Sequence, residues 1–262
     1  MPTGSRWLAA VMTGAVMLSV APTAGAQSRT ARTVRFESPA LGGQATFAIL
    51  LPPGYDASRT RYPVLYLLHG GTQKHTAFPA RTWFTKETSR REMIVVMPHL
   101  PPAYFNSRAA AGTPFEEFLV RDLAGYVDAN YRTVASREAR AVAGISMGGF
   151  AAAIVGLKYG NVFGIVGPIS AALTGSNRQR DVERLVGALS PESAPYFYIA
   201  CGGQDALAPA NRQFAQLLAA RTIAHEYKEV PGDHSWSVWD PQVQAFFDVL
   251  AKQPSWRPAA QR

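Results

Sequence analysis

Ser146 lies at the centre of the pentapeptide Gly-Ile-Ser-Met-Gly formed by residues 144–148. Residues 140–143 are typical of a short buried strand, and residues 150–157 are apolar on nearly all sides, as in a buried helix. A strand, a sharp turn and a helix in this order expose the serine on a strained turn, where its glycine neighbours leave room for it. We therefore predict that Ser146 is a nucleophile.

A serine hydroxyl is a weak nucleophile until a base takes its proton, and that base needs a partner that fixes its tautomer. His234 follows the predicted last strand, 225–230, and Asp205 follows the predicted strand 195–201. Both positions and their order along the chain suit an acid and a base for Ser146. Asp233 is a rival acid, but a residue adjacent to His234 reaches the far side of its ring with difficulty.

Other reactive side chains are weaker candidates. Cys201 ends an apolar strand, where a buried and inert thiol is the commoner outcome. His69 ends a strand, and we expect it to hold the following turn by hydrogen bonds. His69 and His75 suggest a metal pair, but no third ligand is spaced with them, so we expect neither a metal site nor a cofactor.

Acyl transfer also needs two N–H donors for the negative charge that develops on the carbonyl oxygen. The N–H of Met147, immediately after the serine, is one candidate. The second is the N–H of Gly71 in His-Gly-Gly, residues 69–71, which follow a continuous apolar run at residues 62–68.

The elements that carry these residues alternate between strands and helices. Predicted strands are 33–38, 43–51, 62–68, 93–97, 140–143, 163–169, 195–201 and 225–230, and predicted helices are 76–88, 115–131, 150–157, 180–189, 208–220 and 238–251. The first two strands are expected to pair as a hairpin at the sheet edge. This alternation predicts an α/β fold with a mostly parallel central sheet covered by helices on both faces.

The first 26 residues have the features of a signal peptide, with Arg6, an apolar run at 7–21 and Ala-Gly-Ala before the expected cleavage site. The remaining 262 − 26 = 236 residues, 27–262, suit a single domain, with residues 253–262 as a loose tail. The apolar run is shorter than a spanning helix needs, so we expect no stable membrane insertion. The net charge of +8 is scattered, which argues against nucleic-acid binding.

Five motifs together resemble the esterase D and antigen 85-like group of α/β-hydrolases, and the resemblance covers nearly all of residues 27–262. They are Leu67-Leu-His-Gly-Gly71, Phe115-Glu-Glu-Phe-Leu-Val-Arg-Asp-Leu123, Gly144-Ile-Ser-Met-Gly-Gly149, Cys201-Gly-Gly-Gln-Asp205 and Gly232-Asp-His-Ser-Trp236. The resemblance implies a triad of Ser146, Asp205 and His234, with Gly71 and Met147 as oxyanion donors. The chain departs from the group at His99, where many members have Asp.

We therefore expect a secreted or periplasmic serine carboxylesterase that acts on a small-molecule ester through an acyl-enzyme. A serine peptidase or an acyltransferase of the same fold remains open, as does a non-catalytic binding protein on this scaffold.

The expected substrates are short-acyl or aryl esters. Residues 170–191 are the one stretch long enough for a cap, so any cap is small. The long loop 100–114 carries Tyr104 and Phe105, and Trp236 follows His234 by two residues. These aromatic side chains are candidates for the substrate pocket, although packing of the loop onto the domain explains them equally well.

Overall fold

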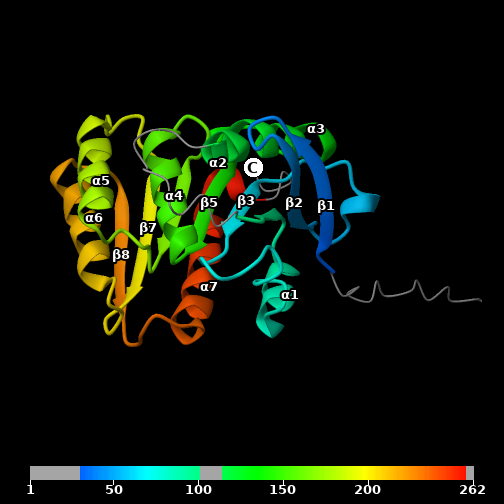
Figure 1. Cartoon of the computed structure of the whole chain (residues 1–262). Coiled ribbons are helices and arrows are strands. Elements are labelled where there is room, and N and C mark those ends of the chain that lie inside the picture. The colour runs from blue at the N-terminus through cyan, green and yellow to red at the C-terminus, as the bar shows by residue number, and fades with distance from the viewer. Residues whose placement is uncertain (1–29, 101–113, 258–262) are drawn as a thin grey trace, which may run out of the picture.

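Within residues 30–100 and 114–257, which the computed structural model describes, eight strands form one sheet. Their order is β1-β2-β4-β3-β5-β6-β7-β8 (Figure 1). The strands are β1 (Arg32–Ser38), β2 (Gly43–Leu50), β3 (Val64–Leu68), β4 (Ile94–Pro98), β5 (Arg140–Ile145), β6 (Ile165–Ile169), β7 (Tyr196–Gly202) and β8 (His225–Val230). The α/β fold predicted from the sequence is confirmed.

The expected edge hairpin is also present. β1 pairs with β2 in antiparallel register from Arg32 opposite Ile49 to Ser38 opposite Gly43. β2 in turn pairs antiparallel with β4, and β3 to β8 all run parallel to one another. Because parallel strands end at the same edge of the sheet, the loops after β3, β5, β7 and β8 gather there, and these loops carry the predicted site residues.

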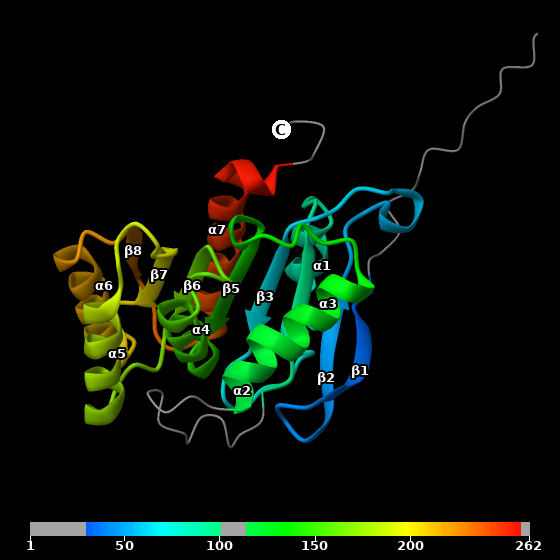
Figure 2. The same ribbon diagram turned by 90° about the horizontal axis from the view of Figure 1, so that it is seen from above.

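Helices cover both faces of this sheet. They are α1 (Thr82–Thr88), α2 (Pro114–Glu117), α3 (Ala124–Asn130), α4 (Met147–Lys158), α5 (Ser176–Ala188), α6 (Ala208–Ala220) and α7 (Trp236–Lys252). A π-helical stretch, Phe118–Leu123, joins α2 to α3, so the three form the long helix that the sequence predicts. The apolar side chains of α3, α4, α5 and α6 pack into one buried cluster, and those of α1 and α7 pack into a second. In Figure 2, α7 lies on one side of the sheet, and α3 and α4 lie on the other.

Several predicted elements begin later in the structure than expected, and β3 and α1 show the reasons. The strand predicted from residue 62 begins at Val64, and Tyr62 makes only an isolated bridge with Thr133, since Pro63 has no N–H to continue a ladder. The helix predicted over residues 76–88 begins at Thr82. Residues 74–81 form successive turns instead, and Pro79 lies among them.

The expectation of a loose tail from residue 253 is wrong for its first part. Pro254–Trp256 form a turn of 3-10 helix, and Trp256 is only 6% exposed. Its indole N–H donates to the carbonyl of Glu138 at 3.0 Å. An indole ring buries a large apolar area and here also finds an acceptor, so it anchors the chain beyond α7.

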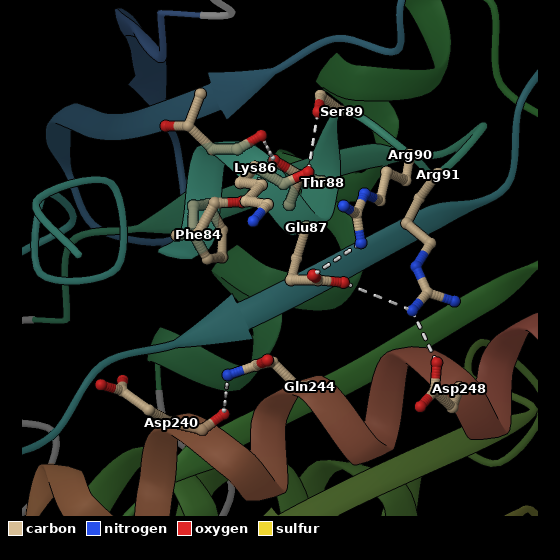
Figure 3. A network of polar contacts seen from close by, with 11 residues as sticks. Phe84, Lys86, Glu87, Thr88, Ser89, Arg90, Arg91, Asp240, Gln244 and Asp248 are labelled. Atoms are coloured by element: carbon tan, nitrogen blue, oxygen red, sulfur yellow. Dashed lines mark hydrogen bonds and ion pairs between the residues drawn. The ribbon is translucent and has the colours of Figure 1, made fainter. Parts of the chain in front are cut away.

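Ion pairs connect α1 and the turn that follows it to α7 (Figure 3). The guanidinium of Arg91 lies 3.7 Å from Glu87 and 2.6 Å from Asp248 of α7. Arg81, just before α1, donates to Asp240 of α7 through Nε at 3.1 Å and Nη2 at 2.5 Å. These contacts fix the position of α7, whose first turn lies next to the candidate site.

Candidate active site

Ser146 occupies the sharp turn between β5 and α4. Its backbone has φ 55° and ψ −115°, a conformation that L-residues rarely adopt. A Cβ on Gly148 would lie 2.4 Å from the carbonyl oxygen of Leu68, and one on Gly144 would lie 2.5 Å from Gly148 backbone atoms. Both positions therefore require glycine, because backbone atoms block any side chain there.

His234 lies between Ser146 and Asp205. Its Nε2 is 2.9 Å from Ser146 Oγ, and its Nδ1 is 2.7 Å from Asp205 Oδ2. Since a carboxylate only accepts, Nδ1–H donates to Asp205, which leaves Nε2 able to accept the Ser146 hydroxyl. The structure thus brings together the nucleophile, base and acid predicted from the sequence, in the order that proton transfer from serine requires.

The loops carrying Asp205 and His234 are bonded to each other. Asp205 is 4% exposed, and its Oδ1 accepts the Leu207 N–H at 2.9 Å. Gln204 N–H donates to the Gly232 carbonyl at 2.9 Å, and the Gln204 side chain accepts the Gly232 N–H. The rival acid Asp233 makes no hydrogen bond to the imidazole and instead accepts the Ser235 hydroxyl at 2.5 Å.

The two predicted oxyanion donors also lie next to each other. A Cβ on Gly71 would come within 3.1 Å of Met147 Cγ, so the Met147 side chain lies against the Gly71 backbone. Met147 begins α4, and the first N–H groups of a helix have no intrahelical acceptor. The helix N-terminus contributes positive potential at the same point.

His69 supports the loop that carries Gly71. Its ring is 1% exposed, Nε2 accepts the Leu100 N–H at 3.0 Å, and Nδ1 lies 2.7 Å from the Gly70 carbonyl. Burial lowers the pKa of His69 to about 4, so the ring is neutral at neutral pH and its Nδ1–H donates to Gly70. The prediction that His69 holds this turn by hydrogen bonds is confirmed.

Two further histidines, His99 and His75, form a cluster with His69. The His99 ring stacks on His69 with centroids 5.6 Å apart, and His75 meets His99 edge-on at 5.9 Å. Burial lowers the pKa of both His75 and His99. No group of three or more His, Cys, Asp or Glu suited to a metal occurs in residues 30–100 and 114–257.

An aromatic cluster backs the imidazole, and its nearest member is not the one expected. Trp239 meets the His234 ring edge-on with centroids 4.9 Å apart, while the predicted pocket residue Trp236 packs on Trp239 at 5.3 Å. The ring centroids of Phe78 and Trp236 are 5.6 Å apart, and Arg81 Cζ lies 4.6 Å from the centroid of the Trp236 ring. The contact between the two tryptophans is missed in the sequence because the predicted helix begins at Val238. The observed helix begins at Trp236, which places Trp236 and Trp239, three residues apart, on one face.

The remaining candidates are placed as follows. Tyr104 and Phe105 lie outside the described residues. Cys201 is fully buried behind the Asp205 loop, and burial raises the pKa of its thiol to about 12. The thiol is therefore protonated at neutral pH, as expected for an inert buried cysteine.

The chain matches a known protein family. The Esterase family model, described as "Putative esterase", matches residues 38–248. An esterase of Mycobacterium tuberculosis is 29% identical over 253 residues, which covers 76% of this chain and 54% of the relative. The chain thus spans about half the length of that relative.

Two solved structures share the fold. An S-formylglutathione hydrolase from Staphylococcus aureus has a TM-score of 0.69 at 21% identity, covering 84% of this chain and 97% of that chain. A ferulic acid esterase from Anaeromyces mucronatus, in complex with ferulic acid, has a TM-score of 0.68 at 22% identity, covering 86% of this chain and 92% of that chain. The likeness at these identities shows the α/β-hydrolase fold.

Proposed function

Because this chain belongs to the Esterase family, we propose that it is an ester-hydrolysing serine hydrolase and that Ser146, His234 and Asp205 are its catalytic triad. The observation that carries this proposal is the position of His234, with Nε2 2.9 Å from Ser146 Oγ and Nδ1 2.7 Å from Asp205 Oδ2. Both distances are within hydrogen-bond reach for a general base and the group that orients it.

The reaction proceeds through a covalent acyl-enzyme. His234 Nε2 takes the proton of Ser146 as Oγ attacks the ester carbonyl, and the N–H groups of Gly71 and Met147 stabilise the oxyanion. The tetrahedral intermediate collapses when His234 returns that proton to the departing alcohol. A water molecule then attacks the acyl-enzyme by the same route, which releases the carboxylic acid and restores Ser146. Asp205 orients His234 throughout.

The substrates that we propose are esters with short or aryl acyl groups. The solved relative from Anaeromyces mucronatus binds ferulic acid, an aryl acid. In this chain, Trp236 and Trp239 provide aromatic surface next to His234. Between β6 and β7 the chain adds α5 but no larger insertion, which favours an open site over one enclosed for long lipids.

We further propose that a signal peptide is cleaved after residue 26 and that the enzyme acts outside the cytoplasm. Residues 27–262 then form one domain. This rests on the sequence of the first 26 residues. In residues 30–100 and 114–257, every helix is too short or too polar to cross a membrane. Sequencing the N-terminus of the protein exported by a secreting host tests this proposal. A first residue of Gln27 is expected, and an uncleaved chain would contradict it.

Replacing the nucleophile tests the triad. We expect Ser146→Ala to lower the hydrolysis of 4-nitrophenyl acetate by about 10³-fold or more, with folding unchanged. Ser255→Ala, which removes a half-buried hydroxyl that donates to the Glu138 carbonyl at 2.6 Å, is the matched control and should retain wild-type activity. A fluorophosphonate should label wild-type protein at Ser146, as located by mass spectrometry. Wild-type rates from Ser146→Ala, or no burst and no labelling in the wild type, would overturn the proposal.

A further inference from the structure

Asn211 lies in the first turn of α6 and is fully buried. Its side-chain amide joins the segment behind Ser146 to the loop that carries Asp205. We propose that Asn211 is a positioning residue that holds the nucleophile and the acid at a fixed separation. This inference rests on the proposed function, since it assigns Asn211 a role relative to the proposed triad.

The first contact of Asn211 is with Ala171, just beyond the carboxyl end of β6. Ala171 N–H donates to Asn211 Oδ1 at 3.1 Å, and Asn211 Nδ2 donates to the Ala171 carbonyl at 2.9 Å. Ala171 is fully buried, and an unpaired peptide group there would be costly. The Asn211 side chain thus pairs with both backbone groups of Ala171, as a neighbouring strand would.

Ala171 connects directly to the nucleophile turn. The next residue, Ala172, donates its N–H to the carbonyl of Ser146 at 3.0 Å. The Cα of Ala171 also packs on α4, only 3.0 Å from where a Cβ on Gly149 would lie. The preceding residue, Ser170, has φ 43°, so surrounding contacts must hold this segment in a strained conformation.

The second contact of Asn211 leads to the acid. Nδ2 also donates to the Leu207 carbonyl at 2.9 Å, and Leu207 N–H donates to Asp205 Oδ1 at 2.9 Å. Both amide protons and the amide oxygen are therefore used. The amide orientation follows from its partners, because a reversed amide would turn its NH₂ group toward the Ala171 N–H.

Two routes consequently connect Ser146 with Asp205. One passes through His234, whose hydrogen bonds change as protons move during the reaction. The other passes behind the site through Asn211, which does not titrate and keeps its bonds throughout. A supporting contact of this kind holds reacting groups in place, and a displacement of about 1 Å can lower a rate about 10²-fold.

The test compares two variants at position 211. Asn211→Leu keeps four side-chain heavy atoms branched at Cγ, is somewhat larger, and loses all three side-chain hydrogen bonds. Asn211→Ser retains a hydroxyl that can donate to the Leu207 carbonyl four residues back, and loses both bonds to Ala171, so it keeps the test open if Asn211→Leu does not fold. We expect kcat for 4-nitrophenyl acetate, per folded molecule, to fall about 10²-fold in both variants, with KM within threefold of wild type.

A matched control separates positioning from stability. Leu218 is fully buried on the same helix, about 10 Å further along its axis. Its side chain has no polar atom and so makes no hydrogen bond to Ala171 or to the Asp205 loop. Leu218→Ala should lower the melting temperature at least as much as Asn211→Ser, while kcat per folded molecule stays within threefold of wild type. If the Asn211 variants melt lower but keep wild-type kcat, or if Leu218→Ala loses as much kcat as they do, Asn211 only stabilises the fold and the inference fails.

The burst phase distinguishes this failure from failure of the proposed function. A wild-type enzyme whose burst of 4-nitrophenol disappears in Ser146→Ala supports the triad, and the Asn211 variants are then judged as above. A wild-type enzyme with neither such a burst nor fluorophosphonate labelling of Ser146 overturns the proposed function and the role of Asn211 together.

Discussion

The Trp239 ring stands edge-on to the His234 ring, with centroids 4.9 Å apart and ring planes at 86°. Trp239 is 7% exposed, so it is a rigid wall behind the imidazole rather than part of the open surface. Its indole nitrogen is buried with no hydrogen-bond partner among residues 30–100 and 114–257. The contact between Trp239 and His234 therefore depends on ring packing and ring electrostatics, and not on a hydrogen bond from the indole N–H.

Substitutions at Trp239 should separate ring packing from the indole N–H. Trp239→Ala leaves a cavity behind His234, and we expect it to cost about 3–5 kcal/mol of stability and to lower kcat about 10- to 100-fold. Trp239→Phe keeps a ring and removes an unpaired buried donor, so most of the activity should remain. Trp256→Ala, in the same apolar cluster beyond the far end of α7, is the control for stability loss alone. Equal kcat for Trp239→Ala and wild type would rule out a role in holding His234.

Two glycine-to-alanine substitutions should have opposite effects. A Cβ on Gly148 would lie 2.4 Å from the Leu68 carbonyl oxygen, which is backbone and cannot move aside. We expect Gly148→Ala to abolish ester hydrolysis and to destabilise or prevent folding. Gly187 lies in α5 with nothing within 4 Å of its would-be Cβ, so Gly187→Ala should add about 0.5–1 kcal/mol through helix propensity. Thermal melts and 4-nitrophenyl acetate assays of both variants check the pair, and an active, stable Gly148→Ala would contradict the geometry of the turn at Ser146.

His69 should make the fold less stable in mild acid. Its folded pKa of about 4 lies below the ordinary value of 6.5, so between these values the unfolded chain binds a proton that the folded one does not. Stability is unaffected by His69 above pH 6.5, falls as pH drops from 6.5 to about 4, and is level below that. The full difference is about 3 kcal/mol at 1.36 kcal/mol per pKa unit.

Urea unfolding from pH 4 to 7.5 measures this effect. His69→Gln should lose stability overall because it disturbs the bonds to Gly70 and Leu100, but its stability should change less with pH over this range than that of the wild type. His75 and His99, whose pKa values are also lowered, account for part of the remaining slope. Identical slopes for wild type and His69→Gln would show that His69 does not titrate in this way.

Trp236 tests the proposed preference for aryl acyl groups. An aromatic contact contributes about 0.5–1.5 kcal/mol, which corresponds to a factor of roughly 2 to 12 in affinity. We expect Trp236→Ala to raise KM by about this factor for a methyl ester of an aryl acid such as ferulic acid, and to leave KM for an acetyl ester nearly unchanged. If both KM values stay at the wild-type level, Trp236 serves only to pack Trp239 and Arg81.

The sequence predicts the strands and the nucleophile turn well because both depend on local patterns. Continuous apolar runs become β3 to β7, and the glycines around Ser146 sit where backbone atoms leave no space for a side chain. Helix starts are less predictable. α1 begins six residues later than the prediction, since turns formed by backbone hydrogen bonds compete with a weakly periodic helix over residues 74–81.

The supporting residues could not be found from the sequence. Asn211 is one polar residue in an ordinary amphipathic helix, and its partner Ala171 is 40 positions away in the loop after β6. Trp239 resembles any apolar residue of α7. Their roles depend on how α6 and α7 pack on the sheet, which is a tertiary property that no local pattern encodes.

Cys201, the only cysteine of the chain, is fully buried and its thiol has a pKa raised to about 12. A protonated thiol without solvent access reacts slowly with maleimides, iodoacetamide and peroxide. A cysteine introduced on the surface would therefore be the sole reactive thiol, so a fluorophore or spin label could be attached at a chosen position without replacing a native residue.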